Sequence, residues 1–469
     1  MIQFDDLLEP NKLYKQTLKD DHHQNVIDFF NGLTDESKVD VDANAMTVRS
    51  IKEKAALIAK LKKQRAGKKG LGTFVMVISI ILIVAGVLAC VIPFAIGFTM
   101  PAGLISLLSG IAGIALAIFL LVIRKRKINS AIKKLDNLIA EETKKQNGFI
   151  EEATNQMLPL NNMFDWNMPA LLFTKTIPLV QMDQYFDKEK FQYMHEKYGF
   201  NENVEKNISS VFIQSGSILG NPFLMERNYV QEMGQYTYTG SITIHWTTIV
   251  GSGKDRRTVR HTQTLTASVT KPKPFYYLDT WLVYSNDAAD KLTFSRVPSK
   301  ANSMNEKELA KYVKDWDKKF DKKNEKALKE GKKVVQEMGN EEFECLFGAT
   351  DRNNDVEFRL LFTPLAQKSM LDLIKTKTPY GDDFTFLKKG PLNYIKTNHS
   401  QSFDLDGNPS KFTHYDYQEI KKRFIEYCDA YLQSFYYDLA PLMCIPLYQQ
   451  HQTFEYIYEG KFNTLPSDL

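Results

Sequence analysis

Two uncharged apolar runs in tandem constrain this chain more than any other feature. Residues 73–94 and 103–123 contain no charged side chain, and each run has about the 20 residues needed to cross a hydrocarbon core of about 30 Å. Two helices buried in a soluble core would be the alternative, but dense positive charge brackets both runs. We therefore predict two transmembrane helices, residues 73–94 and 103–123, joined by a short outer loop, residues 95–102.

Ten basic residues flank the two runs, whereas the connection between the runs is uncharged. Because cytoplasmic segments beside membrane spans are enriched in Lys and Arg, this asymmetry predicts a multi-pass protein of the cell membrane with both termini and the large C-terminal domain in the cytoplasm. The same side chains would attract anionic headgroups of the lipid bilayer. These basic collars are Lys60, Lys62, Lys63, Arg65, Lys68, Lys69, Arg124, Lys125, Arg126 and Lys127.

Small residues recur three or four apart along the second run. A helical face of this kind lets another helix backbone approach closely. Two interpretations fit: the face packs on the first span of the same chain, or it joins copies in a homo-oligomer. Neither run contains an ionisable side chain of the type that marks ion or proton pathways, which disfavours a transporter or channel. The small residues are Ala102, Ser106, Gly110, Gly113 and Ala117.

Helical periodicity continues out of both spans. Residues 43–69, with Asp42 as the N-cap, and residues 124–157 each predict an amphipathic helix. Since the spans are antiparallel, these extensions can pair as a stalk of roughly 30–40 Å. The other interpretation is two separate helices lying on the headgroups. Residues 1–42 form an N-terminal cytoplasmic helical segment without a cleavable signal.

The chain changes character beyond Met157, where prolines, aromatic residues and asparagines interrupt the helical period. We predict a soluble domain with a β-rich part, residues 158–300, followed by an α+β part, residues 301–469. The fold class is therefore α+β, with a two-helix transmembrane hairpin, a helical stalk and a large soluble domain that contains a long antiparallel β-hairpin.

Apolar and polar residues alternate over residues 236–248 and again over residues 258–270. Alternation of this kind predicts two strands with one buried and one solvated face, and the glycines between them supply the turn. The prolines at 272 and 274 are expected to end this hairpin. Four further helices are predicted: one over 187–198 stopped by Gly199, one opened by a capping box of Ser303 and Glu306, one over 363–374 and one over 416–439. Further strands are predicted over 275–284, before a turn at 351–355, over 356–362, and around Phe384 and Tyr394.

Two stretches carry a resemblance to a known family: residues 342–364 (EFECLFGATDRNNDVEFRLLFTP) and residues 440–450 (APLMCIPLYQQ). Together with the apolar hairpin, they resemble an uncharacterised family of bacterial two-pass membrane proteins, classed as a domain of unknown function. The matching residues are Phe343, Asp351, Arg359, Leu361, Thr363 and Pro364, and Phe362 stands where leucine is expected. The resemblance covers about the last third of the chain and the hairpin, and it implies no activity, cofactor or catalytic residue.

Candidate ligand sites are few. His245 and His261 lie on opposite arms of the predicted hairpin and could form a metal pair, although no third ligand is evident. Asp404 and Asp406 resemble the start of a calcium loop, but no liganding glutamate follows and a plain turn explains them. The run from Gly251 to Lys254 lacks the flanking residues of a phosphate loop. No catalytic group and no cofactor is predicted.

Composition limits the remaining function classes. The 60 basic and 56 acidic residues leave a net charge of only +4, so nucleic acid is not an expected partner. The leading hypothesis is a membrane-anchored cytoplasmic scaffold that binds a protein partner or its own copies. The alternative is a lipid- or envelope-associated binding protein. A membrane-tethered hydrolase would need a catalytic cluster assembled from distant residues, so we do not predict an enzyme.

Overall fold

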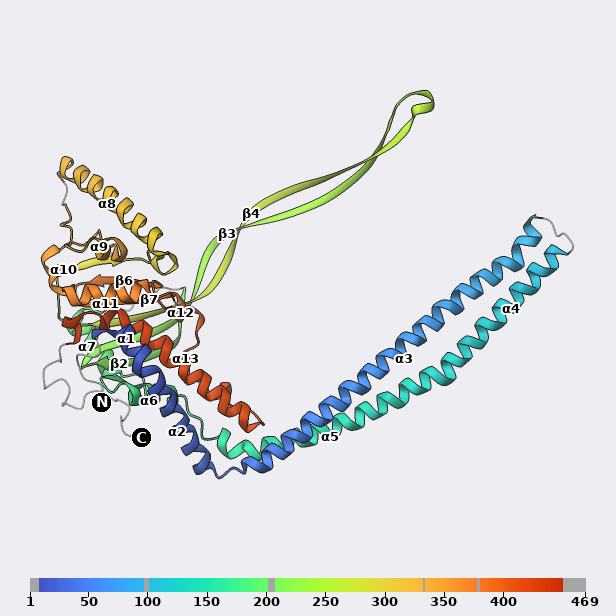
Figure 1. The fold of residues 1–469 in the computed structure, drawn as a ribbon, viewed down its shortest axis with the longest axis horizontal. Helices are drawn as coiled ribbons and strands as arrows, with labels where there is room; N and C mark the ends of the chain where they lie inside the picture. Colours follow the sequence, from blue (N-terminus) through green and yellow to red (C-terminus); the bar gives the residue numbers. More distant parts are fainter. Residues whose placement is uncertain (1–7, 97–100, 201–206, 332–333, 378–379, 450–469) are drawn as a thin grey trace. The chain divides into compact units, whose positions relative to one another are not determined.

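The computed structural model describes residues 8–96, 101–200, 207–331, 334–377 and 380–449 (Figure 1). The chain divides into two compact units. The helical unit comprises residues 30–164 and 409–424, and the sheet unit contains the rest. The predicted α+β fold, with two long apolar helices packed together and a long antiparallel β-hairpin, is confirmed. Residues 97–100 of the predicted outer loop lie outside the described residues.

The first predicted membrane span and its extension form one continuous helix in the helical unit. Helix α3 (Val41–Ile96) joins the segments that the sequence separated at residues 69–73, and it continues past Pro93 into the first two residues of the predicted outer loop. The carboxylate of Asp40, not that of Asp42, accepts the backbone N–H of Ala43 (2.9 Å) at its start. The returning chain comprises α4 (Ala102–Ile123), a π-helical turn (Arg124–Ile128) and α5 (Asn129–Asn161).

The two polar extensions pair with each other. The Lys54 ammonium lies 2.6 Å from the Glu142 carboxylate, and the amide of Gln156 donates to the hydroxyl of Thr47 (3.1 Å). These cross-helix contacts show the predicted stalk, and the alternative of two separate helices on the headgroups is wrong.

One seven-residue repeat runs through both the polar and the apolar part of α3. Its positions are all buried or half-buried, and they change from large or polar side chains near the start of the helix to small ones in the apolar part. The repeat consists of Asn44, Ile51, Ile58, Arg65, Gly72, Ser79 and Gly86. A strict seven-residue repeat indicates left-handed coiled packing against the partner helix.

The partner helices follow the same period with one interruption. Gly103, Gly110 and Ala117 of α4 are buried at seven-residue spacing, and Ala153 and Leu160 of α5 belong to a second series with the same spacing. The two series are out of phase by one residue, and the π-helical turn between α4 and α5 accommodates that extra residue.

The sheet unit is built on seven antiparallel strands in the order β1-β2-β3-β4-β7-β6-β5. The strands β3 and β4 occupy its centre and extend beyond it as a paired ribbon (Figure 1). The strands are β1 (Val180–Met182), β2 (Ile208–Ile218), β3 (Asn221–Val250), β4 (Arg257–Ser285), β5 (Thr293–Arg296), β6 (Phe384–Lys389) and β7 (Leu392–Thr397).

Helices cover both faces of the sheet. Phe223 and Tyr284 belong to the main core, whereas Leu224 and Val283, which point the other way, pack in a smaller cluster with Met194 of α7. Alternate residues of a strand point to opposite faces, so a sheet covered on both sides has apolar residues in succession. The helices are α1 (Pro10–Leu13), α2 (Lys19–Ser37), α6 (Met168–Thr176), α7 (Lys188–Tyr198), α8 (Glu306–Lys329), α9 (Glu341–Phe347), α10 (Asp355–Leu361), α11 (Pro364–Lys375), α12 (Asn398–Ser402) and α13 (Tyr417–Met443), with α2 and α13 shared between the units.

Two predicted strands are helices. Residues 341–347 form α9, and residues 355–361 form α10, whose first turn is capped by the side chain of Asn354. The spacing of the apolar residues explains the error. Leu361 and Phe362 follow Phe358 by three and four residues, which places all three on one face of a helix, and all three are buried. The phenylalanines of the family-like stretch are therefore core residues around Phe294.

Two further predictions require correction. The capping box that opens α8 consists of Asn305 and Glu308, two residues after the predicted pair of Ser303 and Glu306. The predicted third strand over 275–284 is the continuation of β4, because the chain passes through the prolines at 272 and 274 without leaving the ladder. The two prolines are two residues apart, so their nitrogens point toward the same side of the strand. Both can therefore face the open edge of the ribbon, where the missing N–H groups break no hydrogen bond of the ladder.

Candidate functional site

The paired ribbon of β3 and β4 is the part of the sheet unit that no other described element covers. From the pair Glu232 with Phe275 to the pair Val250 with Arg257, the strands bond only to each other. We call these residues, 232–275, the arm. At 3.3 Å per residue each strand of the arm reaches on the order of 60 Å. A two-stranded ribbon alone in water is only marginally stable, so an arm of this length is suited to a partner.

The two faces of the arm differ in chemistry. One face, which we call the apolar face, carries nine large apolar side chains that are each 38–64% exposed. They are Tyr236, Tyr238, Ile242, Ile244, Trp246, Val250, Leu265, Val269 and Phe275. The opposite face, which we call the threonine face, is mostly Thr and Ser, and its cross-strand hydroxyl pairs include Thr237 with Thr270 (2.9 Å) and Thr243 with Thr264 (3.1 Å).

The exposure of the apolar face departs from the sequence prediction. The alternation itself is as predicted, but the face expected to be buried is open to solvent along the arm. If a large apolar side chain presents roughly 150–250 Å² when fully exposed, nine such residues at about half exposure leave on the order of 800 Å². Patches above a few hundred Å² on a protein surface mark interaction sites.

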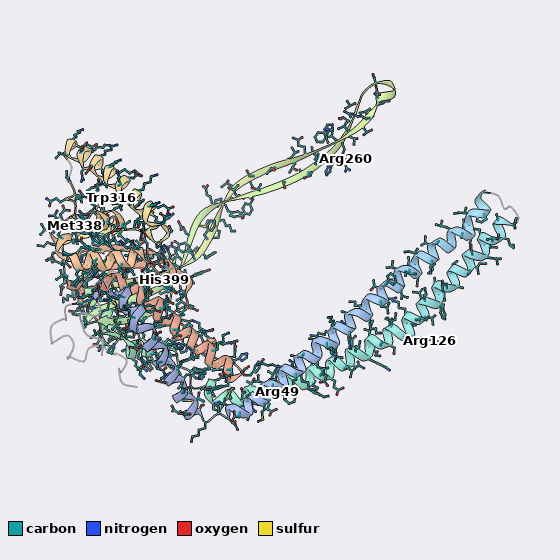
Figure 2. All side chains as sticks on the ribbon, in the orientation of Figure 1. Arg49, Arg126, Arg260, Trp316, Met338 and His399 are labelled. Atoms are coloured by element: carbon teal, nitrogen blue, oxygen red, sulfur yellow. The ribbon has the colours of Figure 1, made fainter. Side chains whose placement is uncertain are left out.

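Basic residues dominate the charge of the arm. The sequence of residues 232–275 has six basic and two acidic residues. On the apolar face, Lys271 and Lys273 lie near the sheet and Arg257 lies near the tip, and the Lys273 ammonium is 4.5 Å from the centre of the Tyr236 ring. Arg260, which Figure 2 labels on the arm, lies on the threonine face by its pairing with Thr247. The arm therefore combines apolar surface with positive charge.

The predicted histidine pair does not form. His261 is opposite Trp246 in the ladder, whereas His245 is opposite Thr262, so the two imidazoles lie on opposite faces of the arm. His261 stacks on the Trp246 ring, with 5.4 Å between ring centroids, and His245 bonds to the Thr262 hydroxyl (2.9 Å). The metal pair is thus wrong because neighbouring positions of a strand point in opposite directions.

The predicted calcium ligands belong to a turn. The Asp404 carboxylate lies 3.2 Å from the Arg227 guanidinium, and the Asp406 carboxylate accepts the backbone N–H of Asn408 (3.1 Å). Gly407, between Asp406 and Asn408, has a φ of +60°, a backbone conformation that favours glycine. Among the described residues, one cluster of three acidic side chains has carboxylates close enough to share an ion. It consists of Asp317, Asp321 and Glu337, which are all partly or fully exposed.

The small residues of the second run face the first span of the same chain. The Gly110 Cα lies so close to α3 that a Cβ there would be 2.7 Å from the Gly86 carbonyl oxygen, and the Ser106 hydroxyl donates to the Ala89 carbonyl (2.8 Å). Ala117 is buried and Gly113 is half-buried in this contact. Ala102 is exposed, because Gly103 occupies the buried position instead. Of the two interpretations, packing within one chain is therefore correct for this face.

The spans and their collars keep the exposure that the sequence predicts. Both α3 and the continuous α4–α5 segment contain a stretch long and apolar enough to cross a membrane, and only 11% of each stretch is buried. Arg65 pairs with Asp136 of the stalk, and Arg124 is half-buried beside Gly72. The other collar side chains, including Arg126 (Figure 2), are exposed.

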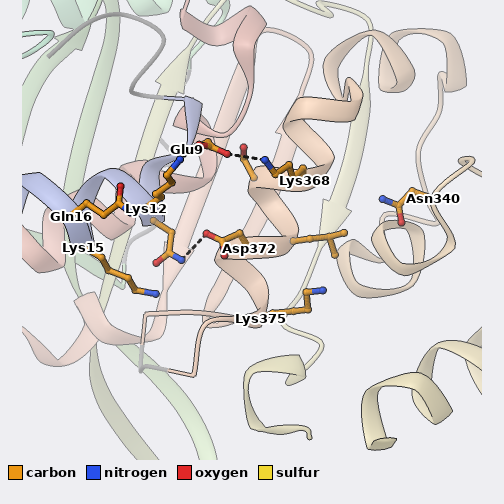
Figure 3. A pocket seen from close by; sticks show the side chains of 11 residues that line it. Glu9, Lys12, Lys15, Gln16, Asn340, Lys368, Asp372 and Lys375 are labelled. Carbon is orange, nitrogen blue, oxygen red and sulfur yellow. Dashed lines mark hydrogen bonds and ion pairs between the residues drawn. The ribbon is translucent and has the colours of Figure 1, made fainter. Parts of the chain in front are cut away.

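A surface pocket of about 670 Å³ lies between the start of the chain and α11. Figure 3 shows four lysines around it, at positions 12, 15, 368 and 375. Glu9 lies 2.9 Å from the Lys12 ammonium and 3.0 Å from the Lys368 ammonium, and Lys375 pairs with Glu342 (3.0 Å). Because three of the lysines are already paired, the pocket is not a concentrated anion site.

A buried histidine cluster lies at the start of α12. His399 (Figure 2) is held between two carboxylates: Nδ1 is 2.6 Å from Asp383, and Nε2 is 3.3 Å from Asp438 and 2.9 Å from the Ser434 carbonyl. Burial alone would lower the pKa of His399, but the Asp438 and Asp383 carboxylates raise it to about 10. The imidazolium is therefore charged at neutral pH with both nitrogens engaged, which is unsuited to a general base.

Two buried lysines in the sheet unit are also structural. The Lys190 ammonium lies 2.6 Å from the Asp183 carboxylate, and both side chains are buried. The Lys388 amine donates to the carbonyls of Gly390 (2.7 Å) and Ala288 (3.1 Å), and burial lowers the pKa of Lys388 to about 7. Neither amine is accessible to a substrate.

Comparison of the chain with protein-family models, with curated proteins and with solved structures finds no match. The resemblance to the uncharacterised family of membrane proteins therefore stays a prediction.

Sequence reasoning missed the histidine cluster and the exposed state of the arm. Asp383, His399 and Asp438 come from three separate segments, so no spacing could have indicated them. For the arm a signal did exist: the alternation of Thr and Ser with Tyr, Ile and Trp continues for much longer than an ordinary strand, which has about 5–6 residues. A strand much longer than its neighbours extends beyond the edge of its sheet.

Proposed function

We propose that this protein is a membrane-anchored scaffold whose arm is the docking element. The single observation that supports the proposal most strongly is the apolar face, which remains exposed on a ribbon that no described element covers. The apolar helical hairpin provides the anchor, and its charged collars favour an orientation with both termini and the sheet unit in the cytoplasm.

The packing of the anchor supports this division of roles. The small residues of α4 are used against α3, and neither apolar stretch contains Asp, Glu, Lys, Arg or His. This composition favours an anchor over a transporter or channel. Docking would fall to the sheet unit, where the arm carries the largest run of uncovered apolar side chains among its described residues.

A membrane-tethered hydrolase is the weaker candidate. The histidine cluster brings together His399, Asp383 and Asp438, but the raised pKa of His399 keeps the imidazole protonated near neutral pH. The hydroxyl of Ser400 bonds to that of Thr397 (2.7 Å) and not to the imidazole. The cluster thus lacks a nucleophile in contact with a base.

Protection of the apolar face in native membranes tests the proposal. Single cysteines replace Ile242 on the apolar face or Thr243 on the threonine face of the full chain, in a Cys90→Ala background whose other cysteines are buried. Maleimide should label the cysteine at 242 at least about fivefold more slowly in native membranes than in detergent, because a docked face excludes the reagent. The cysteine at 243 should change less. Equal rates at 242 in both conditions would show that the arm is not docked and would overturn the proposal.

A further inference from the structure

The chemistry of the apolar face narrows the class of its partner. We propose that the arm docks on an anionic lipid surface through the stretch of the apolar face around Ile242, Ile244 and Trp246. This inference rests on the proposed function, since it names what the docking element binds. It concerns a second membrane contact, separate from the anchor helices.

The residue types on the apolar face match a membrane interface. Trp and Tyr are enriched at the level of lipid headgroups because their rings are apolar and their N–H and O–H groups are polar. In the arm, Tyr236 and Tyr238 lie toward the sheet and Trp246 toward the tip, and aliphatic side chains such as Ile242 and Leu265 lie between them. The aliphatic stretch can thus enter the acyl boundary while the aromatic rings remain at the headgroups.

The charges of the apolar face favour anionic lipid over a second copy of the chain. Lys271 and Lys273 flank the apolar stretch on one side and Arg257 flanks it on the other, and Glu232 is the single carboxylate described on this face, at its base. Two copies placed face to face would bring these basic groups together, which is unfavourable in either direction of pairing. Anionic headgroups attract juxtamembrane Lys and Arg instead.

The threonine face explains how the ribbon remains soluble while the other face is docked. Its hydroxyls pair across the strands, as Thr237 does with Thr270, and Arg260 adds a charge there. Met233 and Ile249 are the two large apolar side chains described on this face, and they lie at its two ends. The central stretch of the ribbon therefore has one polar and one apolar side, which is the β counterpart of an interfacial amphipathic helix. Because a two-stranded ribbon twists, a flat surface meets the central stretch of the apolar face and not its whole length.

The anchor also makes a lipid partner accessible. A surface tethered to the same chain is present at a high effective concentration, so a weak contact suffices when the linkage permits it. A bilayer is the one surface that an anchored chain never leaves. A test should therefore supply lipid both in the nanodisc that holds the anchor helices and as separate vesicles.

The test uses an environment-sensitive dye on the full chain. The cysteines at 242 and 243 described above are labelled with a nitrobenzoxadiazole dye, and the protein is placed in nanodiscs of phosphatidylcholine alone or with about one part in three phosphatidylserine. We expect the dye at 242 to brighten about threefold and shift to the blue with phosphatidylserine, in the discs or after addition of vesicles of the same composition, because it enters a dry environment. The dye at 243 should remain unchanged.

Charge variants separate the faces. The triple substitution Arg257→Gln, Lys271→Gln and Lys273→Gln should reduce the signal at 242 to about a third or less, whereas Arg260→Gln on the threonine face should leave most of it, because only the former three side chains would lie against the headgroups. Raising the salt concentration should weaken the signal in the same direction.

Several outcomes would overturn the lipid assignment. A dye at 242 that stays dim with phosphatidylserine in both formats, that brightens equally in phosphatidylcholine alone, or that behaves like the dye at 243 would each do so. If the cysteine at 242 is protected in native membranes but remains dim with pure lipids, the docking function holds and the partner is a protein. If it is unprotected in native membranes, the proposed function itself fails.

Discussion

The protein contains two long hairpins that expose apolar side chains, one of helices and one of strands, and they expose these side chains differently. In the helical hairpin, the apolar stretches of α3 and α4 are exposed around most of their circumference and contain no charge. In the arm, most of the exposed apolar side chains lie on one face, where basic residues flank them, and only Met233 and Ile249 are described on the other. All-round exposure suits a segment surrounded by hydrocarbon, whereas one-sided exposure suits a segment that lies on a surface.

A charge placed on each hairpin should give the largest contrast. Ile111 of α4 is 55% exposed and Ile242 of the arm is 64% exposed. Ile111→Arg should cost about 3 kcal/mol of membrane insertion, because an arginine then lies in the hydrocarbon core. Ile242→Arg should change the free energy of unfolding by less than about 0.5 kcal/mol. Carbonate extraction of membranes measures the first effect and thermal unfolding in detergent the second, and equal insertion of both variants with the parent chain would remove the distinction.

A buried and an exposed histidine should differ next most strongly. His399→Gln should lower the free energy of unfolding by roughly 2–3 kcal/mol at pH 6, since a pKa raised to about 10 stabilises the fold below the ordinary pKa of 6.5. This contribution is complete below pH 6.5 and is lost as the pH rises toward 10, so wild type and variant should converge there. His261→Gln on the arm should change the free energy of unfolding by less than about 0.5 kcal/mol. Unfolding midpoints in detergent between pH 6 and pH 10 test both, and a constant gap for His399→Gln would contradict the prediction.

The glycines of the two hairpins offer a matched pair. A Cβ at Gly110 would be 2.6 Å from the Cys90 sulfur, whereas a Cβ at Gly240 of the arm would meet nothing within 4 Å. Gly110→Ala should therefore destabilise the helical hairpin by about 1–2 kcal/mol through overpacking. Gly240→Ala should be neutral or slightly stabilising, because alanine restricts the unfolded chain. Thermal unfolding in detergent compares them, and a neutral Gly110→Ala would mean that α3 and α4 separate easily.

Removing one hydroxyl from the threonine face should have the smallest effect. The Thr243 and Thr264 hydroxyls are 3.1 Å apart, and a cross-strand pair of this kind contributes about 0.2–1 kcal/mol. Thr243→Ala should increase amide hydrogen exchange in the arm and leave the sheet unchanged. The double-mutant cycle with Thr264→Ala gives the coupling, and additive effects would show that the pair contributes nothing.

Local signals in the sequence were sufficient for much of the fold. The uncharged runs gave both long apolar helices, and the cap residues gave α7, where Asp187 accepts two backbone N–H groups and Gly199 ends the helix with a φ of +68°. Thr363 and Pro364 likewise gave the start of α11. These features depend on residues close together in the chain, which is why they are readable from sequence.

The errors arose where distant contacts decide the outcome. Residues 341–347 are rich in aromatic side chains and suit either strand or helix, and only the core around Phe294 and the cap at Asn340 select the helix. Alternation predicted the pairing of the two strands of the arm but not their exposure, because covering a strand face requires an element that is distant in the sequence. The cluster of Asp383, His399 and Asp438 is likewise formed only by folding.

The seven-residue seam of α3 gives the helical hairpin a mechanical property. Because the buried positions keep one phase from Asn44 to Gly86, the polar and apolar halves of the helix turn together when either is rotated about its axis. In the described part of the returning chain, the π-helical turn Arg124–Ile128 is where one extra residue absorbs the mismatch between α4 and α5, so we expect this turn to deform more easily than the helices on either side. We therefore expect a twist applied to the two paired helices to be taken up at the π-helical turn, among the basic residues, and not along α3, α4 or α5.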